Sequence, residues 1–317
     1  MKEKRVYTND NIDEWFVYLD EAVINALEHF SKPEIKFPNV NFNEFKRPLV
    51  VGSGNAAVTG KIMFDCVDAV FASESDYLEK LESVSDIDGV IIISASGIKH
   101  ALIICDGVRK KRDKKIPVKL FICNEKLLED SSFVKKFDEI LLFPKLAEPY
   151  TYNTSTYLGM ILTKTGENPK DILKFIKKMK YKDFIKDEQT SYYSYCILVP
   201  SHLHYSTEMF VTKFVELFWP ECVGRSFTIE HARHAVDIIK SDKELFLNLG
   251  VKNDRIGKNR VEISLPKDSG YGCALAIGFY LIGRLQRKKP DWFRKGVVDY
   301  VIRASTDFGK HIEALVE

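Results

Sequence analysis

Two short polar loops in the first half of the chain each stand between an apolar run and a helical pattern. The first loop follows PLVV, and the second follows GVIII. Glycine amides and serine hydroxyls at the start of a helix bind anions, because the first helical N–H groups have no partner and the helix dipole is positive there. Each loop taken alone could also be a tight turn with a helix cap. The residues that could contact a phosphate are Gly52, Ser53, Gly54 and Asn55 in the first loop, and Ser94, Ser96 and Gly97 in the second.

A lysine supports the anion interpretation of the second loop. Lys99 lies in the first turn of the helix expected after this loop, where a cation opposes the helix dipole. A bound phosphate would compensate for that unfavourable position. The two loops, together with Lys99, therefore predict a phosphate-binding site.

The elements around these loops alternate regularly between strands and helices. Helical patterns separate five apolar runs, which read PLVV, AVFA, GVIII, VKLFI and EILL. Runs that do not alternate between polar and apolar residues indicate parallel strands that are covered on both faces. With the strand order 2-1-3-4-5, the first and third strands are neighbours. Both polar loops then meet at the carboxyl edge of the sheet, where ligands bind in folds of this kind.

The second half of the chain repeats this plan of strands and helices less regularly. The segments YSYCILVP and NRVEISLP are expected strands, and YGCALAIGFYLIGRLQRKK is an expected long helix. We therefore expect an α/β protein with two tandem three-layer αβα domains, each flavodoxin-like with a parallel five-stranded sheet. The expected division is an N-terminal helical segment at residues 1–40, a first domain at 41–188 and a second domain at 189–317.

A lysine and a glutamate three residues apart could carry out acid–base chemistry. Lys213 and Glu216 share one face of the expected helix TEMFVTKFVELF. A nearby cation lowers the pKa of a glutamate while burial raises it, so the pair suits a catalytic base, although a surface ion pair is the simpler interpretation. His231 and His234 are one helical turn apart and could transfer protons, or be ordinary packed or surface histidines.

Composition and charge argue against several classes of protein. The 317 residues carry 47 Lys and Arg against 45 Asp and Glu, a formal net charge of +2, so no overall field favours nucleic acid or an anionic membrane. The start of the chain lacks a signal peptide, and no apolar run reaches the ~18 residues that span a bilayer, so we expect a cytoplasmic protein without a membrane segment. The six cysteines never form CxxC, and the histidines fit no common zinc spacing, so we expect reduced thiols and no metal.

Several of these motifs resemble those of the sugar isomerase (SIS) domains, which include the isomerase half of glucosamine-fructose-6-phosphate aminotransferase and related phosphosugar isomerases and deglycases. The segment ISASGIK is similar to the family's SxSGxT loop that grips the sugar phosphate, with Lys99 in the place of the threonine. The segment EPYTYNTSTYLGM resembles one in which a glutamate precedes a Ser-Thr pair: Glu148 and Thr154 keep the spacing, and Asn153 takes the serine position. KFVE resembles the family's KLKE helix. The resemblance covers most of residues 45–317.

The resemblance implies an activity and a role for several residues. It places Lys213 at the position of the active-site lysine and Glu216 at that of the base, and it offers His231 or His234 as the histidine that opens the sugar ring. The implied reaction is the aldose–ketose isomerisation of a sugar phosphate, or a deamination or deglycation through the same enolic intermediate. No cofactor is implied, and the expected assembly is a homodimer with its sites near the subunit interface.

Two alternatives remain open at this point. A sensor that binds a sugar phosphate without turning it over is one, because Asn55 stands where the family usually has a hydroxyl residue. An NAD(P)-dependent enzyme is the other. Gly52, Gly54 and Ala57 spell GxGxxA after a strand, and Glu74 follows about 20 residues later, where an acid that binds ribose would lie. The dinucleotide interpretation leaves the hydroxyls of the second loop unexplained.

Overall fold

The computed structural model describes residues 6–98, 100–111, 116–179, 190–236, 238–307, 309 and 311–316. The chain divides into two compact units. The first unit comprises Phe30–Lys145 and Ser155–Asn168, and the second comprises Met1–His29, Leu146–Thr154 and Pro169–Glu317. The units are therefore interleaved along the sequence, and the boundary expected between residues 188 and 189 lies outside the described residues.

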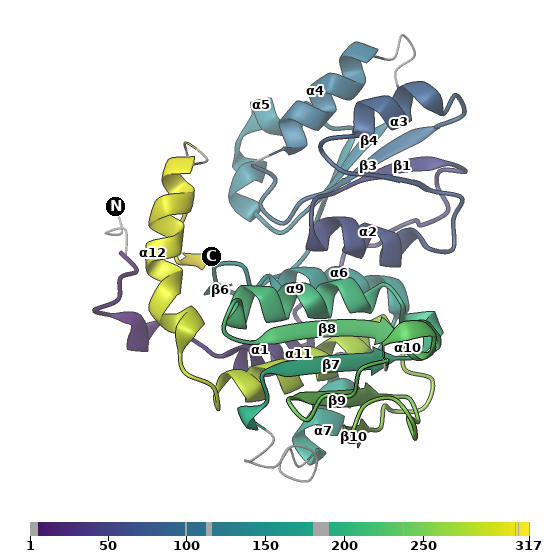
Figure 1. Cartoon of the computed structure of the whole chain (residues 1–317). Helices are drawn as coiled ribbons and strands as arrows, with labels where there is room; N and C mark the ends of the chain where they lie inside the picture. Colours follow the sequence, from purple (N-terminus) through teal and green to yellow (C-terminus); the bar gives the residue numbers. More distant parts are fainter. Residues whose placement is uncertain are drawn as a thin grey trace. The chain divides into compact units, whose positions relative to one another are not determined.

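A five-stranded parallel sheet forms the centre of the first unit (Figure 1). Its spatial order is β2-β1-β3-β4-β5, which confirms the order expected from the sequence. Each strand is three to five residues long and is mostly apolar, so it can be buried on both faces. The strands are β1 (Pro48–Val51), β2 (Val70–Ala72), β3 (Gly89–Ile93), β4 (Val118–Ile122) and β5 (Glu139–Leu142).

Helices cover both faces of this sheet. On one face, α3, α4 and α5 pack against strand residues such as Leu49 and Ile92, and on the other α2 lies against Val50 and Ile93 (Figure 1). Successive strand residues point to opposite faces, so the apolar runs supply both layers of core. The helical elements are α2 (Asn55–Phe64), α3 (Tyr77–Ser83), α4 (Ala101–Lys111), η2 (Glu125–Glu129), α5 (Ser131–Val134) and α6 (Thr154–Thr165), of which Thr154 belongs to the second unit.

The second unit is built on a four-stranded parallel sheet, one strand fewer than expected, within the described residues. Its order is β10-β9-β7-β8. The strand β7, which comes first along the chain, therefore lies between β8 and β9, just as β1 lies between β2 and β3 in the first unit. Its strands are β7 (Ser194–Val199), β8 (Val223–Thr228), β9 (Glu244–Leu249) and β10 (Asn259–Ile263). A separate antiparallel pair joins β6 (Glu148–Pro149) to β11 (Leu315–Val316).

This sheet is also the middle of three layers. Helices α9 and α11 pack together on one face, and the short helix α10 covers the other. The helix α9 approaches β8 closely because Gly224 has no side chain: a Cβ there would lie 1.9 Å from the ring of Phe214. The helical elements are η1 (Ile12–Glu14), α1 (Leu19–Phe30), α7 (Pro169–Lys178), η4 (Ser201–Leu203), α9 (Ser206–Phe218), α10 (Ile229–Ala235), α11 (Tyr271–Gln286) and α12 (Trp292–Asp307).

The helix α1, expected as part of a separate N-terminal segment, is tied to α11 in the second unit. The buried carboxylate of Asp20 accepts hydrogen bonds from Arg287 at 2.8 Å and Arg284 at 3.3 Å. The backbones are also close, because a Cβ on Gly283 would lie 2.0 Å from the amide nitrogen of Asp20. Asp20 and its two arginines therefore bring the start of the chain into the core of this unit.

Within the described residues, every helix is too short or too polar to cross a lipid bilayer.

Candidate functional site

The loop that follows β3 is held in place by its own serines and by the end of β4. The amide of Gly97 donates to Ser94 Oγ at 3.1 Å, and the amide of Ile98 donates to Ser96 Oγ at 3.4 Å. Asn124, which follows β4, donates from its side chain to the carbonyl of Ser96 at 3.1 Å. Each serine oxygen accepts a hydrogen bond within the loop, and among the described residues neither hydroxyl proton has an acceptor, so both can donate to a ligand. Lys99 lies outside the described residues.

The loop that follows β1 opens directly into α2. Gly54 precedes α2 with a φ of +54°, and no side chain caps this end of the helix. Only glycine fits at position 52, because the loop backbone lies so close to α2 that a Cβ there would be 2.8 Å from the backbone of Ala56. Asn55 is only 8% exposed, and its Oδ1 has no hydrogen-bond partner among the described residues. The amide of Ala56 donates to the carbonyl of Ser53 at 3.1 Å, so within the described residues the loop offers the amides of Asn55 and Ala57 and an unsatisfied amide side chain.

The two loops occupy the same edge of the five-stranded sheet. Strand β1 pairs in parallel with β3, with Val51 opposite Ile92, so both strands end at the same level. This is the point where the strand order reverses, and ligands bind at such points in open α/β sheets. The structure therefore brings together the loops Gly52–Asn55 and Ser94–Gly97, as the sequence led us to expect.

A carboxylate lies beside the first loop. The hydroxyl of Ser53 donates to Glu74, and this hydrogen bond holds the pKa of Glu74 below its usual value. Glu74 is therefore ionised at neutral pH and repels an anion at its own end of the loop. A phosphate is better placed toward Asn55 and the serines of the second loop.

In the second unit, Lys213 and Glu216 form a partly buried ion pair on α9. Lys213 is 1% exposed, and its ammonium group donates to Glu216 Oε2 at 2.6 Å, to the carbonyl of Tyr152 at 2.6 Å and to that of Thr151 at 2.9 Å. The side chain of Glu216 is 19% exposed. Burial raises the pKa of Glu216, and the ammonium of Lys213 offsets this only in part. Glu216 is thus the more accessible member of the pair, with the properties of a base.

The segment from Glu148 to Thr154 is the partner of this ion pair. The buried carboxylate of Glu148 accepts a hydrogen bond from the amide of Thr154 at 2.7 Å, at the start of α6. Between them, Thr151 and Asn153 adopt φ values of +75° and +45°, which are uncommon for residues other than glycine. Lys213 donates to the carbonyls of this turn, so Glu148, Asn153 and Thr154 belong to the same hydrogen-bonded arrangement as Lys213 and Glu216.

The two candidate histidines lie on the other face of the second sheet. Phe214 of α9 stacks on Tyr195, with ring centroids 6.0 Å apart, whereas α10 packs on the side of Cys196. Neighbouring residues of a strand point to opposite faces, so α9 and α10 are separated by the sheet. His231 and His234, both exposed on α10, are therefore not brought together with Glu216 within one chain.

Two contributions to these arrangements do not appear among the residues predicted from the sequence. The first is Asn124, although a polar residue directly after the apolar run VKLFIC lies at the same sheet edge as the two loops. The carbonyls of Thr151 and Tyr152 that accept from Lys213 could not be found, because backbone acceptors leave no signal in residue type.

Replacing Gly97 with alanine tests the geometry of the second loop. Gly97 has a φ of +68°, and a Cβ there would lie 2.7 Å from Leu127 Cδ1. Gly166 has a nearly identical φ of +67° with nothing within 4 Å, so it is a matched control. Both variants should lose about 1–2 kcal/mol for the left-handed backbone, and Gly97→Ala should lose about 1 kcal/mol more through overpacking. Urea denaturation measures both; equal losses would show that the loop can move away from Leu127.

Comparisons with known proteins bear on the fold. No protein-family model matches the chain, and no curated protein sequence matches it. Solved structures do match. Glucosamine-6-phosphate deaminase from Thermotoga maritima superposes with a TM-score of 0.58 at 14% identity, over 88% of this chain and 92% of that one. Tagatose-6-phosphate ketose/aldose isomerase from Escherichia coli gives 0.55 at 13% identity, over 88% and 87%.

A third similar structure is the C-terminal domain of glucosamine-fructose-6-phosphate aminotransferase from Francisella tularensis. Its TM-score is 0.50 at 14% identity, over 90% of this chain and 97% of that one. All three cover most of both chains, so the likeness extends over both units. The chain therefore shares the fold of these three proteins, which is the fold that its resemblance to the sugar isomerase (SIS) domains implies.

Proposed function

We propose that this protein binds a phosphorylated hexose or amino hexose and interconverts its aldose and ketose forms. The observation that carries the proposal is the loop Ser94–Gly97 at the point where the strand order of the five-stranded sheet reverses. Proteins with this fold include a deaminase of glucosamine 6-phosphate and an isomerase of tagatose 6-phosphate. A phosphate on the substrate suits the free hydroxyls and helical amides of the two loops.

The phosphate group would be held by the first unit. Ser94 and Ser96 donate their hydroxyl protons, and the free amides of α2 and the side chain of Asn55 complete the set of donors. Such a group binds far from the carbons that react, and its binding energy orients them. The unpartnered Oδ1 of Asn55 supports this role, since the side-chain amide can be turned so that its NH₂ group faces a phosphate.

The proton transfer would be carried out by Glu216. In the aldose–ketose reaction, the carboxylate removes the proton from one of two neighbouring carbons, an enediol forms, and the same carboxyl group returns the proton to the other carbon. The raised pKa of Glu216 favours a base of useful strength. Lys213 keeps Glu216 in place through its hydrogen bond and stabilises the turn at Thr151.

Ring opening would need a histidine from a second copy of the chain. His231 and His234 lie across the sheet from α9, so neither can act beside the Glu216 of its own chain. The proposal therefore includes a homodimer in which α10 of one copy serves the other. A molecular mass of one chain in solution would argue against this part of the proposal.

A sensor of sugar phosphates is the second candidate, and the bonding of Lys213 favours it. The ammonium group of Lys213 already has three acceptors within hydrogen-bond distance, as expected for a structural lysine. A sensor would keep the phosphate site and have no turnover.

A thermal-shift series tests the binding proposal directly. Glucose 6-phosphate, fructose 6-phosphate and glucosamine 6-phosphate are compared with glucose, inorganic phosphate and NAD. A sugar phosphate at 100 times its Kd should add about 2.7 kcal/mol of stability. The Ser94→Ala/Ser96→Ala variant should lose most of this shift, and Ser83→Ala, on the exposed end of α3, should keep it. Stabilisation by NAD alone would overturn the proposal in favour of a dinucleotide enzyme.

A further inference from the structure

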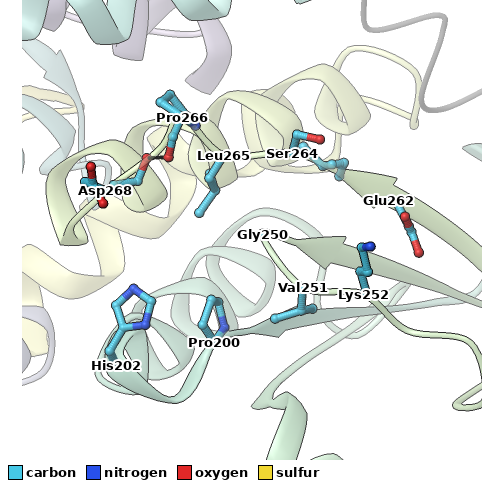
Figure 2. Close-up of a pocket in the computed structure, with 12 residues that line it drawn as sticks. Pro200, His202, Gly250, Val251, Lys252, Glu262, Ser264, Leu265, Pro266 and Asp268 are labelled. Atoms are coloured by element: carbon cyan, nitrogen blue, oxygen red, sulfur yellow. Dashed lines mark hydrogen bonds between the residues drawn. The ribbon is translucent and has the colours of Figure 1, made fainter.

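A separate hollow lies at the carboxyl edge of the second sheet (Figure 2). It has a volume of about 500 Å³. Its walls come from the segments that follow β7, β9 and β10, at Pro200, Gly250 and Ser264. None of the residues expected to bind phosphate lines it, and neither Lys213 nor Glu216 does. The hollow therefore belongs to the second unit alone.

The hollow occupies the position where the second sheet would bind a ligand. In the order β10-β9-β7-β8, β7 comes first along the chain. It pairs with β8, the second strand, on one side and with β9, the third, on the other. The strand order thus reverses between β7 and β9, as it does between β1 and β3 in the first unit. Crevices at such points are the general ligand sites of open parallel sheets.

The polar side chains that line the hollow are not engaged with one another. His202 and Asp268 lie at one end, and Lys252 and Glu262 lie at the other (Figure 2). Within the described part of the chain, none of these four side chains makes a hydrogen bond or an ion pair. By contrast, Ser269 donates to the carbonyl of Pro266 at 2.6 Å. The hollow therefore presents two free carboxylates, one ammonium group and one imidazole.

The charges in this hollow differ from those of the phosphate loops. With a neutral His202, the two carboxylates of Glu262 and Asp268 exceed the single charge of Lys252, so the lining is net negative and disfavours a phosphate. Carboxylates accept from sugar hydroxyls and attract ammonium groups. The lining also has an apolar part, at Val251 and Leu265. Among the described residues no three His, Cys, Asp or Glu side chains are grouped to hold a metal ion.

We propose that this hollow is a second binding site, which takes a small polyhydroxylated amine, that is, an unphosphorylated amino sugar. The ammonium group would pair with Asp268 or Glu262, the hydroxyls would contact the remaining polar groups, and a face of the sugar ring would lie on Val251 and Leu265. This site is independent of the phosphate loops. Its ligand would act on the protein as a regulator or an additional substrate, beyond the proposed isomerisation.

Titration with D-glucosamine, followed by ligand-observed NMR, tests the site. D-glucose and inorganic phosphate are the comparison ligands. We expect glucosamine to bind, and Asp268→Asn and Glu262→Gln each to weaken it by about tenfold through loss of one charge-assisted contact. Asp268 has a φ of +59°, and asparagine tolerates this conformation, so the variant should fold. Glu79→Gln, on the exposed surface of α3, is the matched control and should bind normally.

The outcomes distinguish this proposal from the proposed function. Glucosamine binding that survives in Ser94→Ala/Ser96→Ala places the ligand away from the phosphate loops and supports the second site, whatever happens to sugar-phosphate binding. Loss of glucosamine binding in that variant would overturn the proposal, because the amino sugar would then occupy the first unit. Phosphate binding that is abolished by Lys252→Met, or no binding of glucosamine at all, would overturn it as well.

Discussion

Replacing Glu216 with glutamine is expected to lower the turnover of a hexose phosphate by about 10²–10⁴-fold, the usual contribution of a general base. Glutamine has nearly the same shape as glutamate but cannot accept the proton from the sugar carbon. In the proposed function Ser94 and Ser96 of the first unit hold the phosphate, so the Kd of the substrate should change little. The measurements are the rate of interconversion of aldose and ketose and the Kd of the sugar phosphate, on the same preparation.

The control for this variant is Glu221→Gln. Glu221 is exposed just beyond the end of α9, so the Glu221→Gln variant should keep full activity. If Glu216→Gln turns over at the wild-type rate, the base is another group and the assignment is wrong. If the wild-type protein binds sugar phosphates and has no turnover, the sensor is the correct function.

The pH dependence of activity should follow the carboxylate of Glu216. Its pKa is raised by burial, and only the ionised form can take up a proton. As the pH falls through this raised pKa, kcat/KM should decline, and it should do so at a higher pH than for a carboxylate in water. A profile of kcat/KM against pH measures this. An activity that persists down to the usual range of a glutamate pKa, near 4.3, would contradict the assignment.

The two sheets differ in how far they could be predicted from the sequence. The first sheet has five mostly apolar runs separated by helices, so its strands followed from the pattern, whereas their order 2-1-3-4-5 came from the flavodoxin-like fold class and is confirmed by the structure. In the second sheet β8 and β9 were not recognised as strands. The segment of β8, VGRSFT, has no apolar run, whereas charge alone does not hide a strand, since β10 also carries Arg260 and Glu262. Arg225 of β8 donates from Nη2 to both carboxylate oxygens of Glu244 in β9, at 2.6 and 2.7 Å. This ion pair lets two strands of the sheet each carry a charged residue. Pairing between strands far apart in sequence is not visible in either segment by itself.

The candidate site shows the same limit. The loops at Gly52 and Ser94 could be placed together because parallel strands of known order end at one edge. Lys213 and Glu216 could be paired because residues three apart share a helix face. The position of His231 could not be predicted, since helical spacing does not tell which face of a sheet a helix covers. That face depends on the connection from β8 to β9, and β8 and β9 were not recognised as strands.

The N-terminal helix is a further case. Its residues predict a helix, and α1 is one. The unit it joins depends on Asp20, whose partners Arg284 and Arg287 lie more than 260 residues along the chain. No local pattern links these positions, so the interleaving of the two units is a result of long-range pairing.

Replacing Lys213 with methionine is expected to destabilise the protein by about 3–5 kcal/mol, the cost of removing one partner of a buried ion pair. Methionine fills a similar volume but donates no hydrogen bond. The carbonyls of Thr151 and Tyr152 would lose their donor, and Glu216 would lose its counter-charge. The turn with positive φ at Thr151 and Asn153 would also lose its support. For a unit of this size, the midpoint of thermal unfolding should fall by about 2–4 °C per kcal/mol.

A double-variant cycle separates the ion pair from the backbone contacts. The stability of Lys213→Met, Glu216→Gln and the combination is measured by urea denaturation. In the double variant no charge is stranded, so it should be more stable than the sum of the two single losses predicts, with a coupling of about 1–3 kcal/mol. Lys258→Met is the matched control. Lys258 pairs with Asp242 at 3.0 Å, but both side chains are exposed, so the midpoint should hardly move. Strict additivity, with a large loss in Lys213→Met, would mean that Lys213 stabilises the protein through the carbonyls alone and that Glu216 does not depend on it.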